Sequence, residues 1–288
     1  MIIKEYSNAD VFLKEYEAIL LKREAVAQLL LYFAHQSLTG LGTGKELFGV
    51  VMEEAQIVLI FGMIRGIDLI LYVATSDKEE EAAGALADYL GNSHIIIGSL
   101  NAKQTLCQSF MTQYKKYFNV SFIQKVGMDI MELRQVNDIR AAAGSQRLAE
   151  TEDAKLVADW MIQFQIEELM DEADYEASLL SATQLISRKE LYLYEDEEER
   201  PVSMAAATRR LVHGMGITHV FTPEEYRGKG YAAANLYYLS KALLEQGFEF
   251  CCLYVDKKNP LTIRAYEKIG YRVIEDNYEY MIMPSEEV

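Results

Sequence analysis

One stretch near the C-terminus combines a strand, a glycine turn and a long helix, and this order restricts the folds open to the chain. An apolar strand pattern over 217–222 is followed by the turn "PEEYRGKG" and by a helical pattern over 232–246 that Gly247 closes. A glycine turn between a strand and a helix directs several backbone N–H groups, and the positive end of the helix, toward one place. This predicts an α/β fold with an anion site at the corner, suited to a pyrophosphate.

The residues of this corner fit the anion site, although each also has an ordinary explanation. Gly228 and Gly230 allow close approach of the backbone and positive φ, and Arg227 and Lys229 add positive charge. A solvated basic turn would look the same, so Gly-x-Gly by itself does not decide. A dinucleotide-binding pattern is excluded because Ala233 replaces the third glycine, and "GLGTGKEL" lacks the spacing of a P-loop, which favours a turn there.

Composition bounds the function. The chain has 288 residues, 50% of them apolar, and a formal net charge of −16. It is long enough for two domains, and its charge argues against nucleic acid and favours cationic small molecules. Charges interrupt the most apolar stretch, 56–74, which favours strands over a membrane span. Three cysteines form neither a disulfide framework nor a zinc pattern. We therefore expect a cytoplasmic protein without a metal, a membrane partner or a nucleic-acid partner.

The two halves of the sequence show the same order of predicted elements. In the first half we expect helices at 8–18 and 20–37, strands at 48–54, 57–63 and 67–74, a helix at 78–90, a strand at 94–98, a helix at 102–117, and strands at 120–126 and 128–133. In the second half we expect a short strand near 146–150, a helix from about Thr151 with Thr151 or Asp153 as N-cap, a helix at 176–188, an antiparallel meander of three strands over 190–222, a helix at 232–246, a strand at 248–255, a helix at 260–270, and strands at 271–275 and 278–283. Two copies of one α/β unit and a chance similarity of two α/β patterns both explain this order. The predicted division is a domain at 1–134, a linker at 135–145 and a domain at 146–288.

A second motif strengthens the interpretation of the corner. "RGKGYA" at 227–232 resembles the Arg/Gln-x-x-Gly-x-Gly/Ala motif of the GNAT superfamily of N-acetyltransferases. "NPLTIRAYEKIGY" at 259–271 resembles the second signature of that family, with Asn259 and Tyr266 seven residues apart. The resemblance covers 146–284. It implies a mixed, mostly antiparallel sheet flanked by helices (α/β, or α+β), with a similar but degenerate N-terminal domain in a tandem or glycine-N-acyltransferase-like arrangement.

The resemblance also implies acetyl-CoA as co-substrate and assigns roles to particular residues. Backbone groups of Val220, Phe221 and Thr222 would line the acetyl and pantetheine arm, where the strand at 215–222 parts from the strand at 250–256. Asn259 would hydrogen-bond the arm, and Tyr266 would protonate the departing thiolate. The pyrophosphate would be held at the corner by Arg227, Gly228, Lys229, Gly230, Tyr231, Ala232 and Ala233.

The general base is the point where the sequence departs from its relatives. Many of them carry a glutamate five residues before the asparagine, and Tyr254 occupies that position here. Glu167, Glu168 and His219 are candidates, although the glutamates also fit a solvated helix face and the histidine fits an ordinary strand residue. A water chain, or no base for an amine that arrives neutral, remains an alternative.

The corresponding corner of the first half lacks the anion-binding features. "LYVATSDKEEEAAGAL" has Ser76, Asp77, Lys78 and three glutamates where the second half has Arg-Gly-Lys-Gly. Acidic residues favour a helix start but repel a pyrophosphate, so we expect the first half not to bind coenzyme A. The sequence thus predicts acetyl-CoA-dependent N-acetylation of a small amine by direct attack on the thioester. Acetylation of a protein or peptide, and a non-catalytic acyl-CoA sensor, are the alternatives, and a homodimer is left open.

Overall fold

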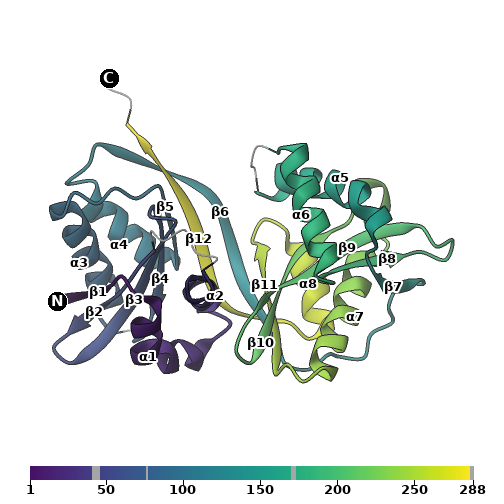
Figure 1. The fold of residues 1–288 in the computed structure, drawn as a ribbon, viewed down its shortest axis with the longest axis horizontal. Coiled ribbons are helices and arrows are strands. Elements are labelled where there is room, and N and C mark those ends of the chain that lie inside the picture. The colour runs from purple at the N-terminus through teal and green to yellow at the C-terminus, as the bar shows by residue number, and fades with distance from the viewer. Residues whose placement is uncertain (41–45, 76, 170–172, 286–288) are drawn as a thin grey trace. The chain divides into compact units, whose positions relative to one another are not determined.

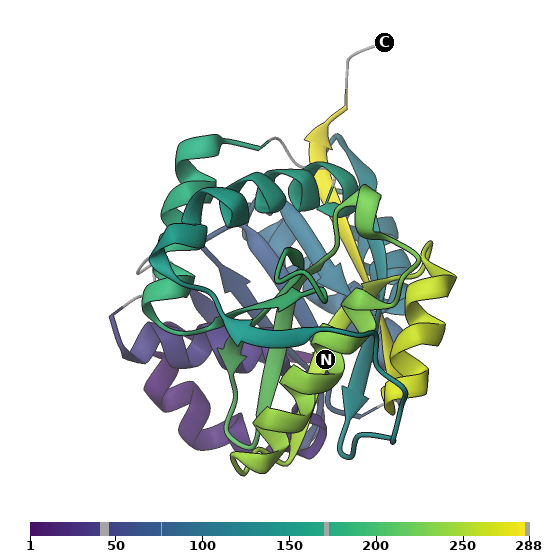
Figure 2. The same cartoon turned by 90° about the vertical axis from the view of Figure 1, so that its right-hand side faces the viewer.

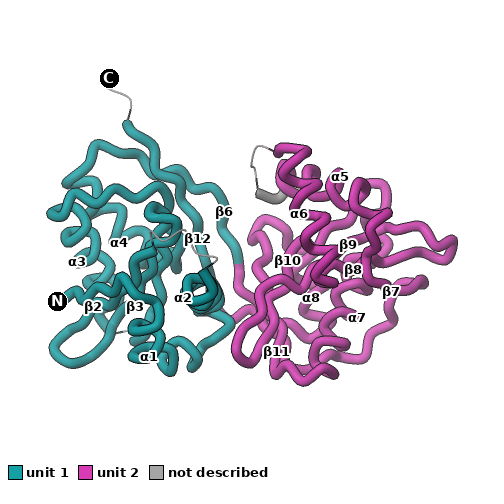
Figure 3. The backbone as a smooth tube through the Cα atoms, in the orientation of Figure 1, with its two compact units in different colours: residues 1–128, 275–288 teal, residues 129–274 magenta. Residues whose placement is uncertain are grey.

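The computed structural model describes residues 1–40, 46–75, 77–169 and 173–285 (Figure 1). They form two compact units, one of residues 1–128 with 275–288 and the other of residues 129–274 (Figure 3). We call these unit 1 and unit 2. Among the described residues, no helix has the length and apolar character needed to cross a membrane.

Unit 2 is built on a mixed sheet with the strand order β7-β8-β9-β10-β11-β6. Neighbours from β7 to β10 are antiparallel, and β10 and β11 are parallel. The strands are β7 (Ser145–Leu148), β8 (Leu191–Glu195), β9 (Pro201–Arg210), β10 (Gly214–Phe221), β11 (Phe250–Asp256) and β6 (Val120–Leu133). The predicted meander over 190–222 is therefore confirmed as β8, β9 and β10.

Helices cover both faces of this sheet (Figure 2). They are α5 (Ala154–Phe164), α6 (Tyr175–Ser187), α7 (Tyr231–Glu245) and α8 (Pro260–Ile269). Successive side chains of a strand point to opposite faces, so Met204 and Ala206 of β9 pack in one cluster with α5 and α6, while Ala205 and Ala207 pack with α7 and α8. We call these the α5/α6 face and the α7/α8 face.

Unit 1 repeats this arrangement. Its strand order is β1-β2-β3-β4-β5-β12-β6, and β4 and β5 form its parallel pair. The strands are β1 (Ile2–Tyr6), β2 (Leu47–Glu53), β3 (Gln56–Ile64), β4 (Asp68–Val73), β5 (Ser99–Ala102) and β12 (Arg272–Pro284). The helices are α1 (Ala9–Leu20), α2 (Gln28–Leu38), α3 (Glu79–Asn92) and α4 (Gln104–Tyr114).

The chain order within the two units agrees with the predicted fold class. In each, two helices follow the first strand, a helix joins the two parallel strands, and another helix follows. The mixed α/β fold with a second, similar unit is thus confirmed. The compact units end elsewhere than the predicted domains, because residues 278–281 of the last strand pair with residues 99–102 of β5 in unit 1. The division of the sequence into two copies at 134 and 146 remains a prediction.

Several predicted elements differ from the observed ones. The strand expected at 94–98 lies instead at Ser99–Ala102, because Ile95 N–H bonds Leu90 O and closes α3, while Ile97 is buried without joining the sheet. β1 was not predicted, and the helix expected at 20–37 begins at Gln28 after a 3₁₀ turn at Leu21–Arg23. The strand pairs expected at 120–133 and 271–283 are each one long strand.

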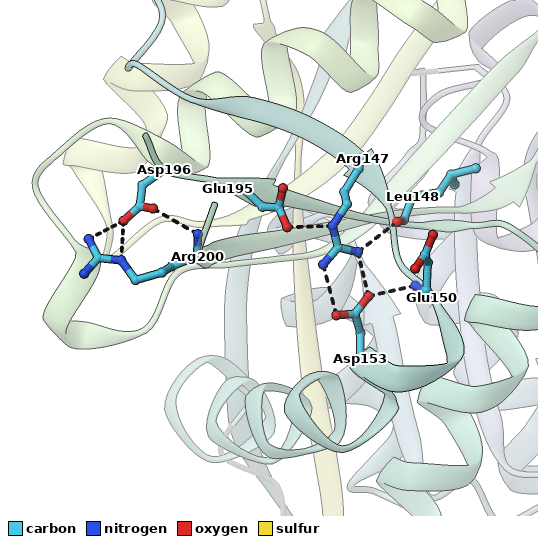
Figure 4. A network of polar contacts seen from close by, with 7 residues as sticks. All are labelled: Arg147, Leu148, Glu150, Asp153, Glu195, Asp196 and Arg200. Carbon is cyan, nitrogen blue, oxygen red and sulfur yellow. Dashed lines mark hydrogen bonds and ion pairs between the residues drawn. The ribbon is translucent and has the colours of Figure 1, made fainter. Parts of the chain in front are cut away.

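A polar network fixes the start of the first helical segment of unit 2 (Figure 4). Asp153 accepts two hydrogen bonds from the guanidinium of Arg147, at 2.6 and 3.0 Å, and one from Glu150 N–H at 2.7 Å. Arg147 also donates to Glu195 on β8 at 2.6 Å. Of the two predicted caps, Asp153 therefore takes part in a capping box with Glu150, while the cap at Thr151 is wrong because Thr151 is already inside the 3₁₀ turn.

Candidate functional site

The strands β10 and β11 separate soon after they meet. Their parallel pairing covers only Gly214 to Gly216 opposite Phe250 to Cys252, although β10 continues to Phe221. On its other side, the register of β10 with β9 shifts after Gly216 and again after Thr218. The shift leaves His219 and Val220 without a partner in β9, and His219 has a φ of +51°. This β-bulge therefore presents backbone groups that no strand ladder uses.

The glycine corner follows directly from the end of β10. After the 3₁₀ turn Glu224–Tyr226, Gly228 and Gly230 adopt φ of +78° and +86°, and Gly230 is the N-cap of α7. The bond from Ala234 N–H to Gly230 O, 3.0 Å, is the first of the helix. The preceding amides of α7 have no carbonyl within the helix to bind, so they point outward at its positive end. A Cβ at Gly228 would meet nothing within 4 Å, and one at Gly230 only Ala142 Cβ at 3.9 Å.

Arg227 connects the corner to the π-helical turn Gln165–Leu169, which follows α5. Its Nε donates to Thr222 O at 2.8 Å, its guanidinium lies 5.5 Å from the centroid of the Phe221 ring, and it forms an ion pair with Glu167 at 2.5 Å. Both ionic side chains are partly exposed, so the pair adds little stability but orients the turn. The charge of Arg227 is thus partly offset by Glu167, whereas the Nζ of Lys229, which is also exposed, lies 3.5 Å from Glu225 O and 5.7 Å from the centroid of the Tyr226 ring.

The last residues of β10 include an unsatisfied polar atom. Thr222 is 9% exposed, and its hydroxyl is buried without a hydrogen-bond partner. Buried hydroxyls are usually paired, so this orphan suits a ligand that offers a hydrogen-bonding group. Together with the open positive-φ glycines and the outward amides of α7, it fits the phosphate and pantetheine portions of coenzyme A.

Asn259 and Tyr266 lie on the helix that follows β11. Asn259 is the N-cap of α8, and its Oδ1 accepts from Thr262 N–H at 3.2 Å, which leaves the amide nitrogen outside the cap. Tyr266 is 5% exposed in the cluster with α7 and β11, and its ring lies 6.1 Å from that of Tyr271. Packing therefore holds the Tyr266 ring in one place, as either a core aromatic or a proton donor requires.

The base candidates differ in what the structure gives them. Glu167 is engaged with Arg227, and the side chain of Glu168 lies outside the described part of the chain. The Nδ1 of His219 lies 2.8 Å from Thr218 Oγ1, and its ring is 5.6 Å from that of Phe164 on α5. Burial, with a contribution from Arg209, lowers the pKa of His219 to about 4, so the imidazole is neutral at pH 7. Among these side chains, His219 is the neutral acceptor.

Arg209 and Tyr254 form a second cluster that the sequence did not reveal. Arg209 lies opposite Gly216 in the β9–β10 register, where β10 leaves β11. Its guanidinium is 5.4 Å from the centroid of the Tyr254 ring, and its Nε is buried without a hydrogen-bond partner. Burial raises the pKa of Tyr254, against the opposing effect of Arg209, so its hydroxyl is protonated at neutral pH and is no substitute for the missing glutamate. In the sequence, "TRR" reads only as the basic end of a strand.

The corresponding corner of unit 1 has a different chemistry. Lys78, the N-cap of α3, has a φ of +60° and bonds Glu53 at 2.7 Å. Three glutamates, 79–81, occupy the first turn, and Glu79 forms an ion pair with Lys103 at 2.9 Å. Ser76 of the predicted corner lies outside the described residues. The positive end of α3 thus already has carboxylates beside it.

Comparison with known proteins shows which family a segment of unit 2 belongs to. Residues 154–271 match the model of the Acetyltransferase (GNAT) family. This segment is a GNAT acetyltransferase domain. The match confirms the resemblance found in the sequence: the segment is a domain of the N-acetyltransferase type, and its family uses an acyl-CoA as acetyl donor. Nowhere in the described residues do three or more His, Cys, Asp or Glu side chains group as metal ligands.

Solved structures share the fold of this chain over nearly its whole length. A Drosophila protein is 11% identical, covers 98% of this chain and 99% of its own, and has a TM-score of 0.63. A GCN5-related N-acetyltransferase from Sphaerobacter thermophilus is 14% identical, with coverages of 90% and 91% and a TM-score of 0.58. A GNAT-family acetyltransferase from Colwellia psychrerythraea is 14% identical, with coverages of 98% and 100% and a TM-score of 0.55. A search of curated proteins gave no match.

Proposed function

We propose that unit 2 transfers the acetyl group of acetyl-CoA to the nitrogen of a small amine by direct attack on the thioester. The observation that carries the proposal is the sequence of bulge, strand separation and glycine corner along one continuous segment. Val220 lies in the bulge, Thr222 ends the strand, and Gly230 begins α7. A thioester, its arm and its pyrophosphate would follow the same order.

Acetyl-CoA supplies an activated acyl group, and the residues of unit 2 would bind and orient it. The outward amides of Tyr231, Ala232 and Ala233, with Gly228, Gly230 and the Lys229 ammonium, would hold the pyrophosphate. The unpartnered Thr222 hydroxyl and the amide nitrogen of Asn259 would hydrogen-bond the arm. Arg227, held by Glu167, would position the turn rather than bind phosphate through a free charge.

The chemical step needs an oxyanion donor and a proton donor. The amine nitrogen attacks the thioester carbon and forms a C–N bond, and the carbonyl oxygen gains negative charge, which the N–H of Val220 in the bulge would stabilise. The C–S bond then breaks, and Tyr266 would give its proton to the leaving thiolate. The nitrogen loses one proton, so the products are the N-acetylated amine and coenzyme A as a thiol.

Removal of the proton from the nitrogen does not require a strong base. An amine that arrives neutral becomes strongly acidic only after it has attacked, so a weak base or a water chain is sufficient. His219, neutral and close to Thr218, would accept this proton directly or through water. Glu167 would have to leave its ion pair with Arg227 to do the same, so we assign it a positioning role.

Thiol release from acetyl-CoA tests the proposal. We expect release to depend on a small primary amine, and the acetylated amine to appear in equal amount by mass spectrometry. Turnover only with peptides would establish a peptide or protein acetyltransferase instead. Coenzyme A binding measured by calorimetry without turnover across both panels would identify an acyl-CoA sensor, and absence of binding would refute the site itself.

A further inference from the structure

We infer that the amine acceptor carries a carboxylate, and that the guanidinium of Arg209 binds it. This inference rests on the proposed acetyl transfer to a small amine and specifies the class of that amine. It assigns a specificity-determining role to Arg209, which neither the family motifs nor the glycine corner includes.

The position of Arg209 places it on the acceptor side of the strand separation. Leu253 and Val255 pack on the α7/α8 face, so Tyr254 between them points to the α5/α6 face. The guanidinium of Arg209 lies over the Tyr254 ring, 5.4 Å from its centroid, and is therefore on that face as well. Tyr254 is two residues beyond Cys252, the last residue of β11 that pairs with β10. Arg209 thus borders the place where the two strands part.

The base candidate shares this location. Thr218, whose partner Ala206 packs on the α5/α6 face, contacts His219 Nδ1 at 2.8 Å. The ring of His219 lies near Phe164 of α5, which covers the same face. The charge of Arg209 also acts on the imidazole. An acceptor bound between these groups would have a cation on one side and a neutral proton acceptor on another.

The hydrogen bonding of Arg209 is incomplete in a way that calls for an anion. Its Nε is buried without a partner, and no described side chain forms an ion pair with it. An unsatisfied buried donor is costly, more so on a charged group. The chain has 44 acidic residues against 28 basic ones, so a partly buried arginine without a carboxylate is not explained by a shortage of partners. A ligand carboxylate would complete its hydrogen bonds.

The geometry of the cluster favours a carboxylate over a phosphate. Stacking of the guanidinium on an aromatic ring leaves its N–H edge for a planar, bidentate partner. A single guanidinium neutralises one negative charge, which matches a carboxylate, whereas a phosphate monoester carries nearly two. An amino acid, in the broad sense of an amine and a carboxylate in one small molecule, meets both requirements.

Matched acceptors test the inference. Thiol release would be measured with the standard amino acids, their primary amides and the corresponding decarboxylated amines, and with β-alanine beside phosphoethanolamine. We expect the wild-type protein to acetylate at least one amino acid with a kcat/KM about 10- to 100-fold above that of its amide, the loss that a charge-assisted hydrogen bond predicts. Phosphoethanolamine as the better substrate of that pair would overturn the carboxylate assignment.

Variants separate recognition from folding. Arg209→Met keeps a long side chain over Tyr254 and should remove this preference by lowering kcat/KM for the amino acid about 10- to 100-fold, with the decarboxylated amine unaffected. Arg209→Lys should restore part of it. Arg210→Met is the matched control, since Arg210 is the exposed neighbour, 5.2 Å from the Phe248 ring, and should leave the preference intact.

The outcomes distinguish this inference from the proposed function. If amides and decarboxylated amines are acetylated as well as amino acids, the carboxylate inference fails and acetyl transfer stands. Equal loss for charged and uncharged amines in Arg209→Met would also overturn it. If coenzyme A binds by calorimetry but no amino acid is acetylated, the inference is wrong and the coenzyme A site stands. If coenzyme A does not bind, the proposed function fails first, and the inference with it.

Discussion

Replacement of Gly230 by aspartate is the most direct test of the glycine corner. The residue is the N-cap of α7 with a φ of +86°, at the point where the pyrophosphate is proposed to approach. Aspartate adds a side chain and a negative charge there, so we expect coenzyme A to bind at least about tenfold more weakly, which is ~1.4 kcal/mol. The protein should still fold, because both effects fall on the ligand.

The structure supports this separation of folding from binding. A Cβ at Gly230 has no neighbour closer than Ala142 Cβ at 3.9 Å, so no clash arises within the protein. A left-handed conformation costs an ordinary residue ~1–2 kcal/mol, and aspartate and asparagine tolerate it better than most. Against the ligand, one pair of like charges ~6 Å apart repels by ~0.7 kcal/mol at water-like dielectric and ~3 kcal/mol at an effective dielectric of ~20. The repulsion from the charge alone therefore covers a range that includes the ~1.4 kcal/mol of a tenfold loss of affinity. The bulk of the added side chain weakens binding further.

Isothermal calorimetry measures the affinity of each variant for coenzyme A. Thermal unfolding shows that each variant is folded. Gly230→Asn is the matched control for size, so the difference between the aspartate and asparagine variants isolates the charge. That difference should shrink at ~1 M salt, where the Debye length is ~3 Å. Gly247→Asp tests position, because Gly247 follows the other end of α7 with a φ of +101° and nothing within 4 Å of a Cβ. It should leave the affinity unchanged. A folded Gly230→Asp protein with wild-type affinity would refute the proposed phosphate site.

Three further predictions follow from the same structure. Tyr266→Phe should lower kcat by ~10²-fold, which is at the low end for general acid catalysis. The affinity for coenzyme A should change little, because the ring and its packing remain. A wild-type kcat in this variant, with the chemical step rate-limiting, would exclude the proton-donor role. Calorimetry should give one coenzyme A per chain, because carboxylates 79–81 occupy the first turn of α3, and a stoichiometry of two would contradict this. Burial alone would raise the pKa of Asp153, but hydrogen bonds from Arg147 and Glu150 N–H bring it below its ordinary value. The stabilisation by this carboxylate is therefore present above its unfolded pKa of ~3.9 and is lost as pH falls through the lower folded value. In urea unfolding, the free energies of unfolding of Asp153→Asn and wild type should differ by ~1–3 kcal/mol at pH 6 and converge as the pH falls below ~4. A difference that stays constant with pH would show that the charge is not involved.

The sequence determined most of unit 2. Apolar alternation in "ELYLYED" and the turn residues after it predicted the meander over 190–222, which the structure shows as three antiparallel strands. Proline and glycine residues marked where helices begin, with Pro260 in the first turn of α8 and Gly230 before α7. These signals depend on neighbouring residues only, which is why the glycine corner and the start of α8 were found without a structure.

Other features depended on contacts between residues distant in the chain. The last strand pairs with β5 at residues 99–102, and no local pattern specifies which of two similar sheets a strand will join. The apolar segment 94–98 looked like a strand, but Ile97 is a buried residue of the loop before β5. A residue can therefore be buried without pairing in the sheet.

The site shows the same division between local and distant contacts. Motif spacing pointed to Gly228, Gly230 and Tyr266, whereas the pairing of Arg227 with Glu167 joins positions 60 residues apart and supports the positioning roles proposed for both. Arg209, Tyr254 and His219 come from three strands and have no common motif, so they could not be recognised as a group in the sequence. Hydrogen-bond satisfaction and charge balance are properties of an assembled interior, and only the tertiary structure decides them.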